Sequence, residues 1–265
     1  MSIKVKDVVK QLESPAENVE SKVDSLIFGD ENDEVKGILV SFIASQYVIE
    51  YAQKIGANLI ISHEGIFFSH TTNERILKDN EVYTEKLELI KQSEISIYRF
   101  HDYVHKYNPD QIAEGLVQKL NWNSYVEAYK PISTILTIPP MSGEEIAKYV
   151  KDKLDIPFVR VVGDLASSYS RIGLLVGYRG GGETAIPLFE KEDLDLIIIG
   201  EGPEWETPEY VRDAVFQGKK KALIMLGHAV SEEPGMEFAA NLLQYHFPSI
   251  PVTFLSEKQH QIKVI

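Results

Sequence analysis

Two apolar runs separated by a helical segment constrain the fold of this chain more than any other feature. Residues 35–42 (Val-Lys-Gly-Ile-Leu-Val-Ser-Phe) and residues 59–62 (Leu-Ile-Ile-Ser) predict strands. Between them, residues 46–55 place apolar side chains at helical spacing, and Gly56 is a typical helix C-cap. Because a connecting helix returns the chain in the same direction, the two strands are expected to be parallel in one sheet.

The alternation of helix and strand continues to the end of the chain. Further helices are predicted at residues 4–12, 80–92, 109–120, 142–154, 183–191, 208–217 and 234–246. Further strands are predicted at residues 95–100, 130–138, 159–162, 171–176, 194–199, 221–226 and 252–255. Pro139-Pro140 is expected to end the strand before it, and residues 26–29 are interpreted as an ordinary strand and turn between Asp24 and Asp30. The sequence predicts an α/β fold.

The order of polar strand ends in the first half of the chain is repeated in the second half. The predicted strands run in turn to His63-Glu64, His101-x-x-x-His105, Glu201 and His228-x-x-x-Glu232. This rhythm predicts two similar α/β lobes with a boundary near residues 125–130. Residues 1–127 are expected to form the first lobe, completed by the C-terminal strand within about 250–265, and residues 128–249 the second.

Composition excludes several classes of protein. The 265 residues are 44% hydrophobic, which is enough for a sizeable core, and the absence of cysteine excludes a thiolate metal site. A net charge of −13 argues against direct nucleic-acid binding. The N-terminus has no apolar core of the signal-peptide type, and the apolar runs are too short to span a bilayer. A cytoplasmic protein with no membrane partner is therefore expected.

The polar strand ends carry residue types that bind metals. In open parallel sheets, ligands bind beyond the carboxyl ends of the strands, where all of these groups are expected to lie. His228 and Glu232 would share one face if their segment is helical, and so would His101 and His105. Imidazole, carboxylate and water ligands suit Zn, Mn, Fe, Co or Mg without choosing among them. The alternative, capping or surface groups around turns, stays open.

Three further features have both a functional and an ordinary interpretation. Glu201, with Trp205 and Glu206 after it, either lines the same site or forms an acidic loop. Gly180-Gly181-Gly182 before a helix either binds an anion or permits close packing, and it is not a nucleotide-binding GxxxxGK[ST] loop. His70, just past Phe67-Phe68, is interpreted as a surface group.

These motifs, in this order, resemble the Nif-three-like family of dinuclear metal-centre proteins, which includes the GTP cyclohydrolase I type 2 homologues. In that family one strand ends in His-His, a second segment reads His-Thr-x-x-Asp, and a late strand ends in Gly-His-x-x-(Thr/Ser)-Glu. The matching segments here begin at Ile61, His101 and Gly227, and the last, Gly-His-Ala-Val-Ser-Glu, is the most specific. Arg171-Ile172-Gly173 and Gly180-Gly181-Gly182 also resemble family segments, so that the resemblance covers nearly the whole chain.

Two ligand positions depart from the family pattern. Glu64 stands where the family has its second His, and His105 stands where the family has Asp. These exchanges leave the number of imidazoles and carboxylates unchanged, as a retained metal site requires. The resemblance implies a toroidal homo-hexamer and two divalent metal ions (Zn, Mn, Fe or Co) per subunit, in a cleft between the lobes. The ligands implied are His63, Glu64, His101, His105, His228 and Glu232, with His101 placed outside the direct ligand set or within it.

Three functional hypotheses remain. The first is a metal-dependent hydrolase of the GTP cyclohydrolase I type 2 kind, acting on a nucleotide or other small phosphorylated substrate, in which Glu201 or Asp102 moves the proton. The second is a non-catalytic metal-binding or regulatory assembly that interacts with protein partners. The third is a metal-free α/β module that binds its ligand at the Gly180–Gly182 turn.

Overall fold

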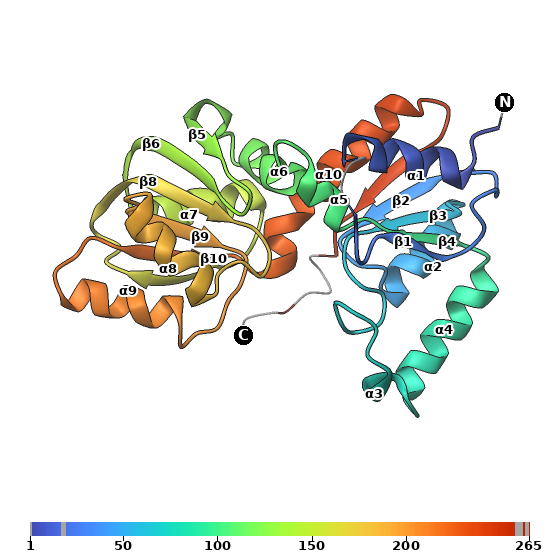
Figure 1. Ribbon diagram of the computed structural model, residues 1–265, viewed down its shortest axis with the longest axis horizontal. Helices are drawn as coiled ribbons and strands as arrows, with labels where there is room; N and C mark the ends of the chain where they lie inside the picture. The colour runs from blue at the N-terminus through green and yellow to red at the C-terminus, as the bar shows by residue number, and fades with distance from the viewer. Residues whose placement is uncertain (1, 17–19, 258–261, 263–264) are drawn as a thin grey trace. The chain divides into compact units, whose positions relative to one another are not determined.

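The computed structural model describes residues 2–16, 20–257, 262 and 265. The predicted α/β fold is confirmed, because helices alternate with the strands of two separate sheets (Figure 1). The chain divides into two compact units: Met1–Gln111 with Met236–Glu257 belong to the first, and Ile112–Gly235 form the body of the second. Most of the predicted segment 250–265 beyond residue 257 lies outside the described residues.

The first unit is built on a five-stranded sheet in the order β1-β4-β3-β2-β11. Its strands are β1 (Ser25–Phe28), β2 (Ile38–Ser41), β3 (Leu59–Ser62), β4 (Ser96–Arg99) and β11 (Val252–Leu255). All neighbours are parallel except the edge strand β1, which is antiparallel to β4. The C-terminal strand thus lies beside β2 in this sheet, and β3 and β4 end together, with Ser62 opposite Arg99.

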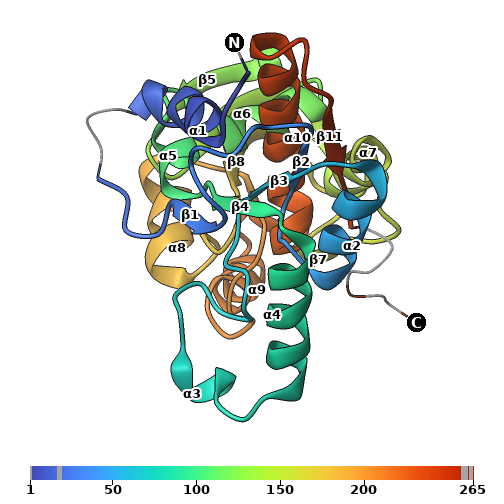
Figure 2. The same ribbon diagram turned by 90° about the vertical axis from the view of Figure 1, so that its right-hand side faces the viewer.

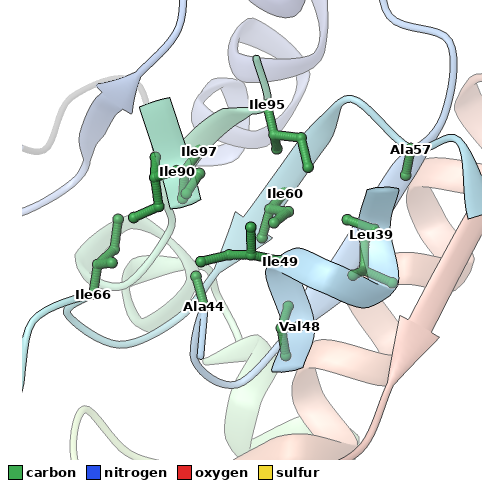
Figure 3. Packing of buried hydrophobic residues seen from close by; sticks show 11 residues of the cluster. Leu39, Ala44, Val48, Ile49, Ala57, Ile60, Ile66, Ile90, Ile95 and Ile97 are labelled. Atoms are coloured by element: carbon green, nitrogen blue, oxygen red, sulfur yellow. The ribbon is translucent and has the colours of Figure 1, made fainter. Parts of the chain in front are cut away.

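Helices cover both faces of the first sheet. They are α1 (Val5–Glu13), α2 (Gln46–Ile55), α3 (Glu74–Leu77), α4 (Glu81–Ser93), α5 (Asp102–Lys106) and the later turns of α10 (His228–His246). Leu39, Ile60 and Ile97 of three adjacent strands pack against Val48 and Ile49 of α2 (Figure 3). On the opposite face, the hydroxyl of Tyr98 donates to Glu13 of α1 at 2.8 Å. Figure 2 shows the short α3 beside the start of α4.

The second unit contains a six-stranded sheet in the order β5-β6-β8-β9-β10-β7. Its strands are β5 (Val126–Tyr129), β6 (Thr134–Ser142), β7 (Arg160–Gly163), β8 (Ser168–Leu175), β9 (Leu196–Ile199) and β10 (Ala222–Met225). Its helices are α6 (Gln111–Lys119), α7 (Gly143–Leu154), α8 (Gly182–Lys191), α9 (Thr207–Phe216) and the first turns of α10. Among the described strands of this sheet, only β8, β9 and β10 are paired with a parallel neighbour, and β9 and β10 lead to the candidate site residues Glu201 and His228.

Two predicted boundaries are wrong for identifiable reasons. β6 continues through Pro139-Pro140 to Ser142 because both prolines fall in a register irregularity between Thr137 and Met141, where a missing N–H costs no ladder hydrogen bond. α10 begins at His228 and passes through Pro234, where the sequence pattern placed the helix start. His228 and Glu232 consequently lie one turn apart on a helix, which is the condition set for them to act together.

None of the helices in the described ranges combines the length and the apolar character that a bilayer span requires.

Replacement of Ile197 by alanine tests the core of the second unit. Ile197 on β9 is fully buried in the cluster formed with Phe189 and Leu223, so the change should leave a cavity and lower the free energy of unfolding by about 2–5 kcal/mol. Phe216→Ala is the control, since that ring is 92% exposed, and it should change stability by less than about 0.5 kcal/mol. Urea unfolding followed by circular dichroism measures both. Equal effects of the two variants would contradict this account of the core.

Candidate metal centre

Three histidines of the first unit meet where β3 and β4 end. His63 follows β3 directly, His101 comes two residues after β4, and His105 lies one turn further on in α5. The rings of His63 and His101 are stacked at 4.6 Å between centroids, and the ring of His105 is 5.1 Å from each of them. One nitrogen from each ring lies within 4.8 Å of the others, so this cluster can hold a metal ion.

Each of the three imidazoles has its Nδ1 atom next to a hydrogen-bond acceptor. Nδ1 of His63 is 3.0 Å from the carbonyl oxygen of Phe100, which can only accept. The corresponding nitrogens of His101 and His105 lie 3.0 Å from the carboxylates of Asp102 and Asp110. With Nδ1 as the donor, Nε2 carries the lone pair of each neutral ring, and an imidazole whose other nitrogen is held in this way is typical of a metal ligand.

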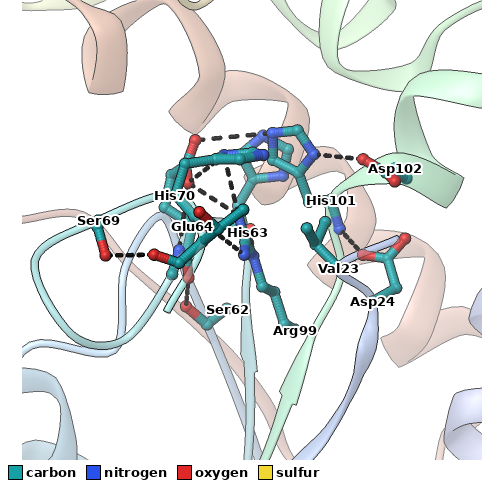
Figure 4. A network of polar contacts seen from close by, with 12 residues as sticks. Val23, Asp24, Ser62, His63, Glu64, Ser69, His70, Arg99, His101 and Asp102 are labelled. Atoms are coloured by element: carbon teal, nitrogen blue, oxygen red, sulfur yellow. Dashed lines mark hydrogen bonds and ion pairs between the residues drawn. The ribbon is translucent and has the colours of Figure 1, made fainter. Parts of the chain in front are cut away.

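The surroundings keep His101 neutral and fix its backbone. Burial, together with the neighbouring His63 and His105, lowers the pKa of His101 to about 3, and the neutral form is the one that binds metal. Asp24 accepts hydrogen bonds from the backbone N–H groups of His101 and Tyr103 at the start of α5 (Figure 4). Burial raises the pKa of Asp24, although these two N–H groups oppose the shift. Asp24 therefore positions His101, a role that its place between a loop and a strand did not indicate.

Glu64 belongs to a second possible ligand group. The guanidinium of Arg99, itself only 4% exposed, donates to Oε2 of Glu64 at 3.1 Å. The carboxylate of Glu64 lies 3.6 Å from Nε2 of His101 and 3.3 Å from Nδ1 of His70 (Figure 4). Glu64, His70 and His101 offer ligand atoms within 4.8 Å of one another. His70 is 52% exposed, which agrees with its interpretation as a surface group, and no regular spacing in the sequence links it to the strand ends.

The loop that carries Glu64 and His70 is anchored by a buried lysine. Lys86 of α4 is 5% exposed, and its ammonium group donates to the carbonyl oxygen of Ile66 at 2.6 Å. The same ammonium lies 5.6 Å from the ring centroid of Phe67 and 5.7 Å from that of Phe68, within the range of cation–π attraction. Burial lowers the pKa of Lys86 to about 8, and the charge of Glu257 opposes this shift.

The second unit holds a histidine between two carboxylates. Nδ1 of His228 is 2.8 Å from Oε1 of Glu201, at the end of β9, and Nε2 is 3.1 Å from Oε2 of Glu232, one turn along α10. Glu232 is 2% exposed. This repeats the arrangement in the first unit, with Nδ1 held by an acceptor and Nε2 directed toward a second ligand group. It also brings together the predicted residues Glu201, His228 and Glu232.

Two glycines give these side chains their space. A methyl group on Gly177, whose φ is +61°, would lie 2.2 Å from Oε1 of Glu232. A methyl group on Gly200 would lie 2.5 Å from Oγ of Ser231, which accepts from the N–H of Gly177 at 2.9 Å and donates to the carbonyl of His228 at 2.7 Å. The ends of β8 and β9 thus approach α10 closely enough to fix the first turn, where His228 lies.

The glycine-rich turn is occupied by a side chain of the same unit. The carboxylate of Glu206 accepts the N–H of Gly182 at 2.6 Å, at the N-terminus of α8. A cavity of about 760 Å³ adjoins this turn, and the residues lining it include aromatic rings and carboxylates but no Lys, Arg or His: Tyr178, Gly181, Gly182, Glu183, Thr184, Ile186, Pro203, Trp205, Glu206, Glu209, Tyr210 and Asp213. This charge favours the close-packing interpretation of Gly180–Gly182 over anion binding.

The sequence comparison identifies the family. The family model described as Duf34/NIF3 (NGG1p interacting factor 3) matches residues 3–261. The chain belongs to this family. The resemblance drawn from the strand-end motifs is therefore confirmed.

Relatives of this Duf34/NIF3 protein match most or all of its length. It is 26% identical over 247 residues to a GTP cyclohydrolase 1 type 2 homolog from Clostridium perfringens, covering 88% of each chain. The crystal structure of Staphylococcus aureus hypothetical protein SA1388 matches with a TM-score of 0.77 at 20% identity, covering 100% of both chains. A Bacillus cereus protein related to NIF3 matches with a TM-score of 0.74 at 16% identity, covering 100% of this chain and 99% of that one. The two structures establish the shared fold.

The anchoring of the loop by Lys86 predicts a specific pH dependence of stability. The ordinary lysine pKa is 10.5 and the folded value is about 8, so between these pH values the unfolded chain binds a proton that the folded chain has released. The free energy of unfolding should therefore rise with pH across this window, as the cost of burying the ammonium disappears. Urea unfolding of wild type and Lys86→Met at several pH values measures this rise. The free energy of unfolding should rise with pH in the wild type relative to Lys86→Met, which has no ammonium group at this position.

Lys91→Met, on the exposed side of the same helix, is the control and should retain the wild-type pH dependence. If wild type and Lys86→Met change in parallel from about pH 8 to about pH 10.5, then burial of the ammonium does not control stability in this window.

Proposed function

We propose that this Duf34/NIF3 protein is a metal-dependent hydrolase with two divalent ions, acting on a nucleotide or other small phosphorylated substrate. The observation that carries the proposal is shared by four histidines. His63, His101, His105 and His228 each have Nδ1 at 2.8–3.0 Å from a carbonyl or carboxylate oxygen. Four surface or capping histidines would not be expected to share this arrangement, whereas metal ligands regularly do.

The proposed ligands are the six predicted ones: His63, Glu64, His101, His105, His228 and Glu232. Their oxygen and nitrogen donors suit Zn, Mn, Fe or Co, and their geometry does not distinguish these ions. His101 offers one lone pair once its Nδ1 donates to Asp102, so it serves only one ion at a time. The proposal of two ions extends the family resemblance, and the proposed nucleotide substrate extends the name of the Clostridium perfringens relative.

Bound divalent ions would lower the pKa of a coordinated water and polarise the substrate. The carboxylates beside the imidazoles have different capacities to accept a proton. Asp102 already accepts from His101, from the Ser21 hydroxyl and from the N–H of Lys22. Although burial opposes the shift, these hydrogen bonds lower its pKa, which makes it a poor base. Glu201 is 42% exposed and has one oxygen on His228, so we assign the proton-accepting role to Glu201 and an orienting role to Asp102.

Elemental analysis of untagged protein tests the metal proposal directly. We expect two divalent ions per chain in the wild type and fewer in His63→Ala and His228→Ala, since each variant removes one imidazole ligand from one unit. His246→Ala is the control, because this histidine lies at the far end of α10 and belongs to none of the possible ligand groups.

Turnover of a nucleotide panel, followed by chromatography, should require the metal and should be lost in His228→Ala. Wild-type protein without metal, or a His228→Ala variant with wild-type rates, would refute the hydrolase. Metal-loaded protein without turnover, copurifying with a stoichiometric partner, would instead support the non-catalytic assembly.

Replacement of Glu201 by glutamine separates its two proposed effects. Loss of the carboxylate beside Nδ1 of His228 should make the imidazole less basic and weaken metal binding by about 10- to 100-fold. At saturating metal, kcat should still fall by about 10²- to 10⁴-fold if Glu201 accepts the proton. Glu204→Gln, at a 75% exposed side chain paired with Arg160, should affect neither quantity. A normal kcat at saturating metal would assign Glu201 to orientation alone.

The homo-hexamer is proposed on the family resemblance, and the cytoplasmic location expected from the sequence stays a proposal. Analytical ultracentrifugation of the metal-loaded protein tests the hexamer, and a monomer at all concentrations would refute it.

A further inference from the structure

The two oxygens of the Glu64 carboxylate have different partners. Oε2 accepts from the guanidinium of Arg99 at 3.1 Å and from the N–H of Gly65 at 3.2 Å. Oε1 lies 3.6 Å from Nε2 of His101 (Figure 4). We infer that Arg99 is a positioning residue that restricts Glu64 to metal ligation through Oε1 alone, and so keeps one position on that ion for water or substrate. The inference rests on the proposed function for the presence of the ions.

Oε1 of Glu64 and Nε2 of His101 have the spacing of two ligand atoms on one ion. Because Nδ1 of His101 is held by Asp102 at 3.0 Å, Nε2 carries the lone pair of the neutral ring. At 3.6 Å the two atoms are too far apart for a hydrogen bond. Two ligand atoms that each lie about 2.0–2.2 Å from a tetrahedral zinc ion are about 3.3–3.6 Å apart. One ion therefore fits between Oε1 and Nε2.

Arg99 holds Oε2 from a fixed position. The residue is only 4% exposed, and its guanidinium also donates to the backbone carbonyl oxygens of His63, at 3.4 Å, and of His70. These two backbone contacts orient the planar group independently of Glu64. A carboxylate has about four lone-pair sites on its two oxygens, so Arg99 can occupy Oε2 while Oε1 keeps the capacity to bind metal. Turning Oε2 toward the ion would break its hydrogen bond to a buried charge.

His70 contributes to the orientation of the guanidinium. Its Nδ1 lies 3.1 Å from Nη2 of Arg99, the same nitrogen that donates to Oε2 of Glu64. Because a guanidinium only donates, Nδ1 of His70 accepts, and its lone pair is used in this contact. Nη2 carries two hydrogens, one for each acceptor. Arg99 thus holds Oε2 of Glu64 and Nδ1 of His70 together, and neither atom is left to serve the ion.

Ligation through one oxygen determines how many positions on the ion the protein fills. A carboxylate that binds through both oxygens takes two positions, whereas one that binds through a single oxygen takes one. Catalytic zinc sites typically have three protein ligands and keep the fourth position for water or substrate. By holding Oε2 of Glu64, Arg99 preserves such a position without contacting the ion itself.

A crystal structure of the Zn²⁺-loaded wild-type protein tests the inference directly. Oε1 of Glu64 should lie about 2.0–2.2 Å from a zinc ion, and Oε2 should keep its hydrogen bond to Arg99. Ligation through Oε2 or through both oxygens would overturn the inference, and so would zinc bound without Glu64.

Titration of Arg99→Lys with Co²⁺ separates the shape of the guanidinium from its charge. Lysine keeps the positive charge but replaces the planar fork with a single ammonium, so Oε2 of Glu64 is no longer held in place. One Co²⁺ binding step should weaken by about 10- to 100-fold. The visible absorption of that ion should also become weaker, because Co²⁺ with more ligand atoms absorbs less strongly. Arg75→Lys, at an exposed position of α3, is the matched control. A wild-type affinity and spectrum in Arg99→Lys would overturn the inference.

A double-variant comparison shows whether Arg99 acts through Glu64. Glu64→Ala should weaken the same Co²⁺ step, because a ligand is lost. In this background Arg99→Lys should cause no further loss, since the carboxylate that it positions is absent. An equal further loss would mean that Arg99 supports only the surrounding loop, which would overturn the inference.

The outcomes separate this inference from the proposed function. A wild-type chain that binds neither Co²⁺ nor Zn²⁺ would overturn both. Two bound ions with Oε2 of Glu64 among their ligands would overturn the inference alone. Circular dichroism shows whether the variants fold, and the structure of the Zn²⁺-loaded wild type decides the matter even if Arg99→Lys does not fold.

Discussion

The hydrogen bond from Nδ1 of His63 to the carbonyl oxygen of Phe100 is the interaction on which the candidate site of the first unit depends. It joins the ends of β3 and β4, two parallel neighbours whose last residues are in register. Because the acceptor is a backbone carbonyl, its position does not depend on a side-chain rotamer. The bond therefore fixes both the tautomer and the orientation of the His63 ring, which is fully buried. His101 can stack on His63 only because the next residue after Phe100 continues from the same strand end.

Charge compensation is local and is built into the same strand ends. A carboxylate as enclosed as Glu64, 14% exposed at its side chain, requires a positive partner, and the last residue of β4 supplies it through Arg99. Burial lowers the pKa of Arg99, although Glu64 and the carboxylates of Asp24 and Asp102 oppose that shift. The guanidinium thus remains charged among acids that also hold the ligand backbone. Removing one member would leave the others buried without compensation, so these groups act as a unit.

Periodicity and strand ends predicted the fold class and drew attention to the residues of both ligand clusters. They did so because parallel strands place their carboxyl ends at one edge, a rule that needs only the sequence order. Asp24, Asp110 and Arg99 were missed for a physical reason. Asp24 accepts a hydrogen bond from the backbone of His101, 77 residues away in the sequence. Arg99 has the sequence pattern of an ordinary strand residue, and only the fold shows that it pairs with Glu64. The anchoring of a loop by Lys86 depends likewise on tertiary contact, which helical spacing does not encode.

At each of the two departures from the family pattern, a neighbouring side chain of complementary chemistry contacts the exchanged residue. Where the family resemblance led us to expect a second histidine, Glu64 introduces a negative charge, and Arg99 lies against it at 3.1 Å. Where it led us to expect an aspartate, His105 introduces an imidazole, and the carboxylate of Asp110 holds its Nδ1 at 3.0 Å. A site losing its ligands would have no need of such partners. The pairing instead maintains, at each exchanged position, the charge and tautomer that a ligand requires, so that Glu64 and His105 remain in clusters that could hold a metal ion.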